Sequence, residues 1–334
     1  NKRKNFKKNI FFIITMNHYV LNFSTKKIKM SLSLFLKIIF LVFFIFKSSF
    51  SFEVNEVAEG LFVHFGKQED SSSKNNGDIA NIGFIVGSKS IAVIDTGGTP
   101  EIGKSLLKKI KEISKLPISH IIITHSHPDH FFGTQELINN KTIVLGHEKL
   151  ERALINNFEF YKNLQFNLIK QESIKQAKLI VPNKTVKVGS IETIDIGNRE
   201  IEIQAWKSGH TDNDLSIYDK KTKFFWSENI FIQRIPSIRA SIKGWKSNLD
   251  ETLKMDIDTI IPGHGPLKKK NEAIKPMTNY FDRLIKEVRK FHKTGKTLKE
   301  TQNRAAPKNK EKWLLFDSYH NSNITKTYTE LEWE

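Results

Sequence analysis

The feature that most constrains this chain is the segment His125-Ser126-His127-Pro128-Asp129-His130, which offers four side chains that can bind a metal. Imidazole and carboxylate groups suit zinc. Their spacing is too dense for one face of a helix, so we expect a loop. Residues 118–124 before the segment are rich in β-branched side chains and predict a short buried strand, and residues 131–138 after it predict a helix. Because α/β folds place their sites in such loops, the segment predicts a metal centre.

Two further short segments carry histidines next to glycine. One is Ser208-Gly209-His210, and the other is Pro262-Gly263-His264-Gly265. Together with the first segment they supply five histidines and one aspartate. Such a set of ligands is enough for two metal ions, so we expect a centre that binds two metals.

The remaining pattern predicts one α/β domain. Strands are expected in a hairpin at 82–95, in two or three antiparallel segments within 186–206, in a second hairpin at 215–226, and at 142–145 and 258–261. Helices are expected at 101–115, at 147–178 with one or two breaks, at 247–255 and through a tail at 271–334. Because strands and helices occur in both halves and no linker divides them, we expect two sheets packed face to face between helices. Residues 52–334 then form a single domain that includes the helical tail.

The charge of the chain is concentrated at its N-terminus. The net charge is +17, and residues 1–51 hold ten Lys or Arg and no acidic residue, which leaves +7 for residues 52–334. No basic motif interleaved with aromatic residues accompanies this charge, so the sequence argues against a nucleic-acid partner. The chain has no cysteine, and its stability must therefore come from core packing and metal binding instead of disulfides.

The N-terminal residues predict export. An apolar run at 38–46 has nine residues, which is too short for a membrane span of about 20, and small residues at Ser49 and Ser51 fit a cleavage site after Ser51. We therefore interpret 30–51 as a signal peptide that starts at Met30, and residues 1–29 as a non-native extension. The expected location is periplasmic or secreted, with no stable membrane span after cleavage. An uncleaved N-terminal anchor is the alternative.

The three histidine segments resemble those of the metallo-β-lactamase superfamily in order and spacing across roughly residues 57–267. The resemblance implies a four-layer αββα sandwich, here with C-terminal helices, and a metal-dependent hydrolase that acts on a small molecule. It implies that His125, His127 and His210 hold a first zinc, and that Asp129, His130 and His264 hold a second. It also implies a catalytic role for Asp129, which would orient a metal-bound hydroxide and later help to protonate the leaving group.

One position departs from the superfamily pattern. Many of these hydrolases have an aspartate that bridges both metals at the end of a strand, and here Glu228 stands in the equivalent place. A glutamate is longer by one methylene group and could bind one metal or both. It could also point away, which would leave one metal or two unequal sites. We expect Glu228 to act as a ligand.

Other residues are expected to support the centre. Asp95 ends a predicted strand and resembles a position near the metals, where it could orient a ligand histidine or simply cap a turn. Two loops, at 68–78 and 231–243, are expected to shape the substrate pocket. Their conformation cannot be derived from the sequence, so the sequence does not supply the substrate.

A finer resemblance points to the quinoprotein relay system zinc metallohydrolases. It rests on residues 76–87, on 234–238 with 243–245, and on the tail from 319 to 334. This group accompanies periplasmic PQQ-dependent alcohol dehydrogenases and c-type cytochromes. The resemblance therefore implies a zinc hydrolase of carbonyl, ester, thioester or amide substrates, with a quinoprotein dehydrogenase or cytochrome as a partner.

Three alternatives stay open. A true metallo-β-lactamase is favoured by export and by residues 211–213, although that group usually has Cys or Ser where Glu228 stands. A thioesterase similar to glyoxalase II, or a persulfide-processing enzyme with a single iron, would use the same histidines. A non-enzymatic protein could keep the metal for folding or for docking a redox partner.

Overall fold

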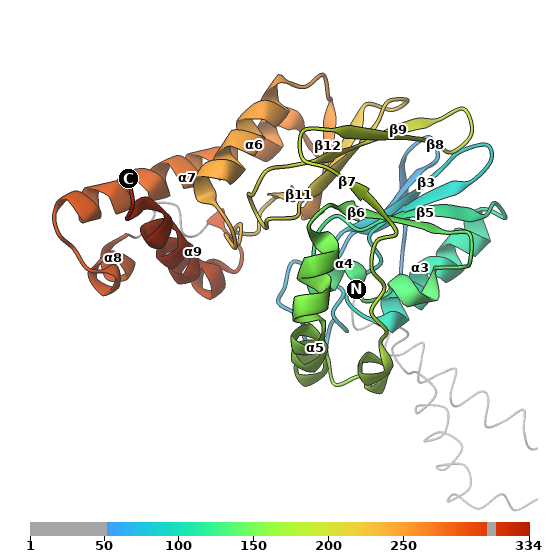
Figure 1. Ribbon diagram of the computed structural model, residues 1–334, viewed down its shortest axis with the longest axis horizontal. Coiled ribbons are helices and arrows are strands. Elements are labelled where there is room, and N and C mark those ends of the chain that lie inside the picture. The colour runs from blue at the N-terminus through green and yellow to red at the C-terminus, as the bar shows by residue number, and fades with distance from the viewer. Residues whose placement is uncertain (1–51, 306–311) are drawn as a thin grey trace, which may run out of the picture. The chain divides into compact units, whose positions relative to one another are not determined.

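The computed structural model describes residues 52–305 and 312–334 (Figure 1). The predicted extension at 1–29 and the predicted signal peptide at 30–51 lie outside the described residues. Phe52–Glu334 forms one compact unit. No helix within the described ranges combines the length and apolar character that a membrane crossing requires.

The first sheet has seven strands that are hydrogen-bonded in sequence order. The strands β1 to β4 pair antiparallel, and the strands from β4 to β7 pair parallel. The seven strands are β1 (Asn55–Ala58), β2 (Leu61–His64), β3 (Ile82–Val86), β4 (Ile91–Ile94), β5 (Ile118–Ile122), β6 (Ile143–His147) and β7 (Lys184–Val186).

The second sheet has six strands in the order β13-β12-β11-β10-β9-β8. All neighbours are antiparallel except β11 and β12, which run parallel. The six strands are β8 (Ile191–Asp195), β9 (Glu200–Ala205), β10 (Leu215–Asp219), β11 (Phe224–Phe231), β12 (Thr259–His264) and β13 (Lys268–Lys269).

Alternating side chains give each sheet two buried faces. In β4, Ala92 and Ile94 join the core between the sheets, whereas Ile91 and Val93 join the core beneath the helices. Successive side chains of a strand point to opposite faces, so a strand covered on both sides is apolar throughout. On the second sheet, Trp226 belongs to the core between the sheets and its neighbour Phe225 to the core beneath the helices.

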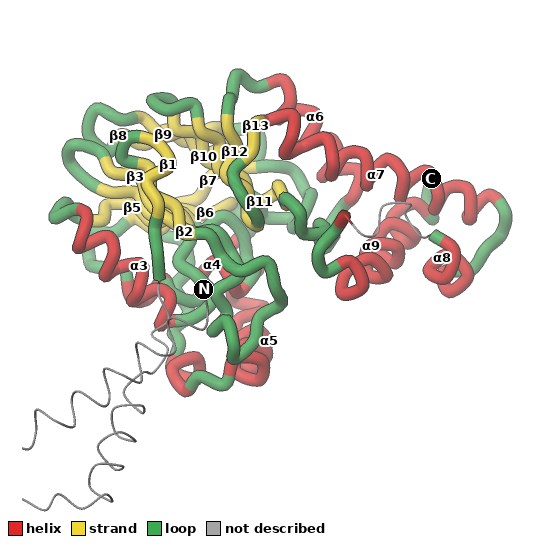
Figure 2. The backbone as a smooth tube through the Cα atoms, turned by 180° about the vertical axis from the view of Figure 1, so that it is seen from behind, coloured by secondary structure: helices red, strands yellow, loops and turns green. Residues whose placement is uncertain are grey.

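Helices cover the outer face of the first sheet and the side of the second sheet formed by β11 to β13 (Figure 2). On the side of the first sheet lie α3 (Pro100–Ile113), α4 (Pro128–Phe131) and α5 (Leu150–Ile169). On the side of the second sheet lie α6 (Ile242–Lys254) and α7 (Lys270–Lys293), followed by α8 (Leu298–Arg304) and α9 (Phe316–Leu331). This arrangement is the predicted αββα sandwich with C-terminal helices.

Helix α3 illustrates how local sequence sets an element. Pro100 occupies its first turn, and Thr99 caps it by accepting a hydrogen bond from the Ile102 N–H at 3.3 Å. Its buried residues include Ile102, Leu106 and Ile110, which follow a helical spacing and face the first sheet.

Two predicted elements differ from the structure. The helix expected at 131–138 is instead the single turn α4, which begins inside the histidine segment at Pro128, followed by a short 3-10 helix at Thr134–Glu136. Two or three antiparallel strands were expected within 186–206, but Val186 ends β7, which begins at Lys184 and pairs parallel with β6 in the first sheet. The connection between β7 and β8 therefore crosses from one sheet to the other.

Candidate metal centre

The predicted ligands come together at one end of the two sheets. The segment from His125 to His130 follows β5, His210 lies in the connection from β9 to β10, and His264 is the last residue of β12. Glu228 lies within β11, beside β12. The sequence could not show this meeting directly, because it depends on the pairing of strands from both halves of the chain.

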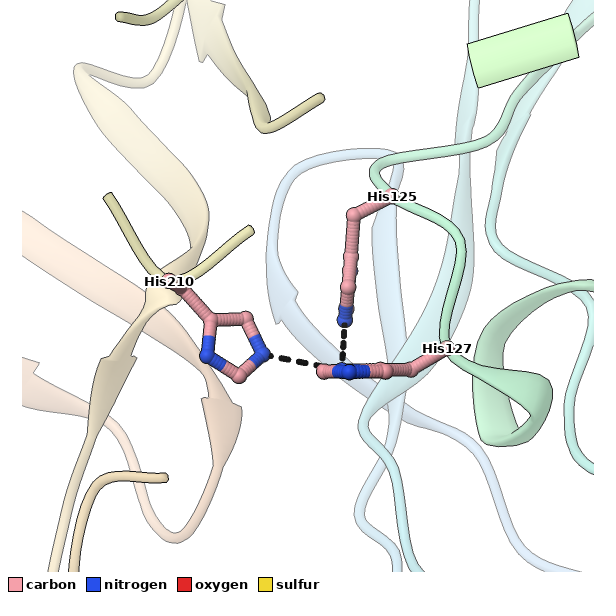
Figure 3. A group of neighbouring side chains, drawn as sticks. All are labelled: His125, His127 and His210. Atoms are coloured by element: carbon pink, nitrogen blue, oxygen red, sulfur yellow. Dashed lines mark hydrogen bonds between the residues drawn. The ribbon is translucent and has the colours of Figure 1, made fainter. Parts of the chain in front are cut away.

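Three histidines form the first group, with ring nitrogens that converge (Figure 3). His125 Nε2 lies 2.9 Å from His127 Nδ1, and His210 Nε2 lies 3.0 Å from the same atom. A neutral imidazole carries one lone pair, on its deprotonated nitrogen, that can bind a metal. Three such nitrogens that face one point therefore suit a single cation.

Hydrogen bonds behind the rings fix which nitrogen faces the centre. His210 Nδ1 donates to the Ser237 carbonyl at 2.8 Å, which leaves Nε2 free. His125 Nδ1 lies 3.2 Å from Thr124 Oγ1, and that hydroxyl donates its proton to Asp95 at 2.7 Å. His125 Nδ1 must therefore be the donor in its pair, and its Nε2 is also free for the centre.

The second group contains Asp129, His130 and His264. Asp129 Oδ2 lies 3.3 Å from His130 Nε2 and 3.5 Å from His264 Nε2. His264 Nδ1 donates to the Ile79 carbonyl at 2.7 Å, so its Nε2 faces the carboxylate as a lone pair. The geometry is again that of ligands arranged around one position.

Asp95 is the residue that orients His130. Its Oδ2 accepts a hydrogen bond from His130 Nδ1 at 2.8 Å, and its Oδ1 accepts one from the Thr124 N–H at 2.9 Å. Asp95 is fully buried and has a φ of 54°, which is uncommon for a residue with a Cβ. Of the two roles considered for Asp95, the structure therefore shows the orienting contact.

Glu228 reaches the centre from behind His130. Its Oε1 accepts a hydrogen bond from Trp226 Nε1 at 2.9 Å, and its Oε2 lies 3.4 Å from His130 Nδ1. Glu228 also forms a third possible metal-binding group with His125 and His130. Gly263 makes this position possible, because a Cβ there would lie 2.1 Å from Glu228 Oε2.

Four of the five candidate ligand histidines are held in the neutral form that binds metals. Burial lowers the pKa of His127 to about 3, and it lowers the pKa values of His125, His210 and His264 well below the ordinary value. His130 differs: burial opposes its charged form, but the carboxylates of Asp129, Glu228 and Asp95 outweigh burial and raise its pKa well above the ordinary value.

The carboxylates are divided between two environments. Burial opposes the charge of Asp129, but His130 and the other histidines hold its pKa well below the usual range. Burial raises the pKa of Glu228 to about 8. A cation bound there would stabilise the ionised form of both carboxylates.

Two atoms test whether a metal fits. His130 Nε2 and Glu228 Oε2 are both buried and have no hydrogen-bond partner among the described residues. Buried polar atoms are nearly always paired, and both of these lie in the groups of possible ligands. The donor set of imidazole and carboxylate suits zinc, so the residues present fit the predicted metal.

A cavity of about 770 Å³ opens over the centre. Both predicted pocket loops line it, with Asp70 and Ser71 from one and Arg234 and Arg239 from the other. Two contributions were missed by the sequence interpretation. Helix α5 lines a wall with apolar side chains, and Tyr319 reaches the cavity from α9. The available signal for the first was the spacing of Phe160, Leu164 and Leu168, which lie four residues apart in the sequence.

Comparisons with known proteins agree with this geometry. The family model described as the metallo-beta-lactamase superfamily matches residues 75–264, which is more than half of the chain. A linear primary-alkylsulfatase from Pseudomonas sp. (strain ATCC 19151) is 27% identical over 71 residues, which covers 21% of this chain and 13% of the relative.

Two solved structures share the fold. A double mutant of the sec-alkyl sulfatase PisA1, from Pseudomonas sp., has a TM-score of 0.65 and 18% identity, and the match covers 85% of this chain and 51% of that one. A metallo-beta-lactamase from Pontibacter korlensis has a TM-score of 0.56 and 18% identity, with 70% and 99% covered. The chain thus spans about half the length of the sulfatase structure.

The matched span contains every predicted ligand from His125 to His264, and the strands that carry them are those of the shared fold. The two groups of possible ligands form a candidate metal site, as the name of the superfamily leads one to expect. The chain therefore belongs to the metallo-β-lactamase superfamily.

Proposed function

We propose that this protein is an exported zinc-dependent hydrolase that cleaves ester, thioester or amide bonds of a small molecule. One observation carries the proposal. Two groups of three possible ligands lie beside one cavity, which is lined by His127 and His210 of the first group and by Asp129 and His264 of the second. In the second group His130 Nε2 has no hydrogen-bond partner among the described residues. Paired metals are suited to hydrolysis, in which an attacking and a leaving oxygen, nitrogen or sulfur need stabilisation together.

The residues divide the work between binding and proton transfer. His125, His127 and His210 would hold one zinc, and Asp129, His130 and His264 the other, with Glu228 beside His130 as an additional ligand. Zinc bound there supplies Lewis acidity and makes a coordinated water acidic near neutral pH. Asp129 orients the attacking water, accepts its proton and passes that proton to the leaving group. Asp95 keeps His130 in the correct tautomer.

A substrate panel tests this function. Zinc-loaded protein is assayed with p-nitrophenyl esters, acyl thioesters and nitrocefin, before and after treatment with a chelator. We expect hydrolysis of an ester or thioester that is lost on chelation, returns with zinc and is absent from His127→Ala. Activity that survives in the chelated protein or in His127→Ala would overturn the proposal. Hydrolysis restored by iron and not by zinc would contradict the assignment of zinc.

Sulfate-ester hydrolysis is a second candidate. Its support is the similarity to two alkylsulfatases, together with Arg234 and Arg239 in the cavity wall, whose guanidinium groups suit a sulfate. Release of inorganic sulfate from decyl sulfate, with no turnover of carboxylic esters, would favour this candidate over the first. Turnover of nitrocefin alone would favour a true β-lactamase.

The cellular setting is part of the proposal. The signal-like segment at 30–51 and the resemblance to the quinoprotein relay group support export to the periplasm and a role beside a quinoprotein dehydrogenase or its cytochrome. Expression from Met30 in a Gram-negative host should yield a periplasmic protein whose N-terminal residue is Phe52. A protein that keeps residues 30–51 and stays in the cytoplasm would contradict export.

A further inference from the structure

We infer that the substrate of this centre is an amphiphile, with an anionic group bound by Arg234 and Arg239 and an apolar chain that lies along α5. The inference rests on the proposed hydrolase function and deepens it by naming the substrate class. It comes from three properties of the cavity wall: an apolar stripe, an under-partnered buried cation and an unpaired exposed cation.

Helix α5 presents two apolar stripes. One stripe, which includes Leu154 and Phe158, is buried in the core beneath the first sheet. The other consists of Phe160, Leu164 and Leu168, which are spaced four residues apart, line the cavity and are 64%, 37% and 43% exposed. An apolar stripe left in water at the edge of a cavity is suited to an apolar ligand.

Arg234 is a buried cation with spare hydrogen-bond donors. It is 5% exposed, and its Nε has no partner among the described residues. Its Nη1 lies 3.2 Å from His264 Nδ1, but that nitrogen already donates to Ile79 and cannot accept. Its Nη2 donates to Tyr319 at 3.1 Å, and the carboxylate of Asp70 is 3.9 Å away. Buried charges are normally paired, so this arginine can still accept an anion.

Arg239 is the second cation of the wall. Its backbone N–H donates to the His210 carbonyl at 3.1 Å, which places the residue directly beside the centre. Its side chain is exposed and lines the cavity, and no residue in the described ranges forms a hydrogen bond or ion pair with its guanidinium. A free guanidinium can bind a carboxylate or a sulfate through two parallel hydrogen bonds.

The acidic residues of the wall leave one of these cations without an ionic partner: Asp70 pairs with Arg234 at 3.9 Å, and no carboxylate among the described residues pairs with Arg239. Asp70 accepts hydrogen bonds from Tyr319 at 2.6 Å and from Ser318 at 3.2 Å. Asp212 is paired with Arg152 at 2.6 Å. The third carboxylate, Asp129, belongs to the ligand group. A ligand that enters along α5 therefore meets the unpaired guanidinium of Arg239 and the unpartnered Nε of Arg234.

Binding of simple amphiphiles tests the inference separately from catalysis. The zinc-loaded protein is titrated by calorimetry with acetate, hexanoate, decanoate, decyl sulfate and decyltrimethylammonium, at concentrations below micelle formation. We expect decanoate or decyl sulfate to bind at least about tenfold more tightly than acetate, because added methylene groups bury apolar surface. Decyltrimethylammonium should not bind. The acetate arm measures the affinity that the metals alone give a carboxylate.

Variants assign the two parts of the ligand. Arg239→Gln should weaken binding of the anionic amphiphiles by about tenfold, whereas Arg289→Gln, a remote exposed arginine, should not. Phe160→Ser combined with Leu164→Ser should weaken decanoate and leave acetate unchanged. Ile155→Ser is the matched control, since Ile155 is an exposed apolar residue of the same helix that does not line the cavity. Metal content is measured for each variant.

The outcomes are decisive in both directions. Affinity that is independent of chain length, equal binding of the cationic amphiphile, or an Arg239→Gln effect no larger than that of Arg289→Gln would overturn the inference. Tighter binding of decyl sulfate together with release of sulfate supports the inference and shows that the anionic group is the one that reacts. Tighter binding of decanoate supports the inference and shows that the anionic group serves to bind the substrate. Selective binding without any hydrolysis would count against the proposed function and not against the ligand class.

Discussion

Glu228 is the residue at which this chain differs most from the pattern of its superfamily. Its longer side chain passes behind His130, where Trp226 holds one carboxylate oxygen and Gly263 leaves room for the other. Burial raises its pKa to about 8. Without a cation, Glu228 therefore favours its protonated form in the folded state, whereas in the unfolded chain it ionises near 4.5.

This difference predicts a dependence on pH for the metal-free protein. Because the pKa of Glu228 is higher in the folded than in the unfolded chain, the folded protein loses stability as the pH rises from about 4.5 to about 8. Metal-free Glu228→Gln should therefore be more stable than wild type at pH 8, by at least about 1 kcal/mol, with a smaller difference at pH 6. Thermal unfolding after chelation measures the difference, and Glu272→Gln, an exposed glutamate, is the control.

In the zinc-loaded protein, the Glu228→Gln substitution should weaken metal binding instead of stabilising the fold. If Glu228 is a ligand, Glu228→Gln binds less zinc than wild type, because an amide is a weaker ligand than a carboxylate. Identical zinc loading together with unchanged stability at both pH values would show that Glu228 neither binds metal nor stores unfavourable charge.

At the scale of single residues, the resemblance of the three histidine segments to those of the superfamily was what predicted which side chains come together. The dense spacing from His125 to His130 requires a loop, and glycine beside His210 and His264 marks two more. The orientation of Glu228 could not be predicted, because it depends on contacts with Trp226 and Gly263 that only the pairing of β11 with β12 creates.

Among the secondary-structure elements, α9 has an unexpected role in supporting the centre. Its Asn323 side chain accepts a hydrogen bond from the Ile238 N–H at 2.9 Å and donates one to the Pro236 carbonyl at 2.7 Å. Between these two residues lies Ser237, whose carbonyl orients His210. The C-terminal helix thus fixes the loop that carries both the partner of a ligand and the cavity arginines.

Removing this connection should weaken both stability and metal binding. Asn323→Ala leaves two buried backbone groups unpaired, which costs about 1–3 kcal/mol of unfolding free energy. We also expect a lower affinity for zinc, because His210 loses its fixed orientation. Asn321→Ala, at an exposed position of the same helix, is the matched control. Denaturant unfolding and zinc titration measure both effects, and equal results for the two variants would refute the role of α9.

Element prediction was accurate where period and turn signals were strong, as in the hairpin of β3 and β4 and in α3. It was wrong where tertiary contacts decide. The strand β7 is three residues long and takes its partner from β6, which precedes α5 along the chain. The turn α4 starts at Pro128 because proline suits the first position of a helix, even between ligands.

For the whole molecule, the buried histidines dominate the response to acid. The pKa values of His125, His127, His210 and His264 are lowered by burial, that of His127 to about 3, whereas an unfolded histidine titrates near 6.5. As the pH falls below about 6.5, the unfolded chain takes up protons that the folded chain does not, so stability falls. Glu228 and Asp214, whose pKa values burial raises to about 8 and about 7, act in the opposite direction, but four histidines outweigh two carboxyl groups.

The metal-free protein should therefore unfold at lower temperature at pH 5 than at pH 7, and the zinc-loaded protein should release zinc over the same range as protons compete for its ligands. Thermal melts of chelated protein across this range, with zinc release followed by a colorimetric indicator, measure both. A melting temperature that stays constant or rises as the pH falls would contradict the assignment of four neutral buried histidines.

The most direct test of the account is the metal content of the protein purified without added metal, by mass spectrometry of the acid-digested protein. The two ligand groups predict about two zinc ions per chain in the wild type and at most about one in His127→Ala. A content of about one iron per chain would contradict the claim of a two-zinc hydrolase. A folded wild-type protein that retains no metal even when zinc is supplied would contradict it as well.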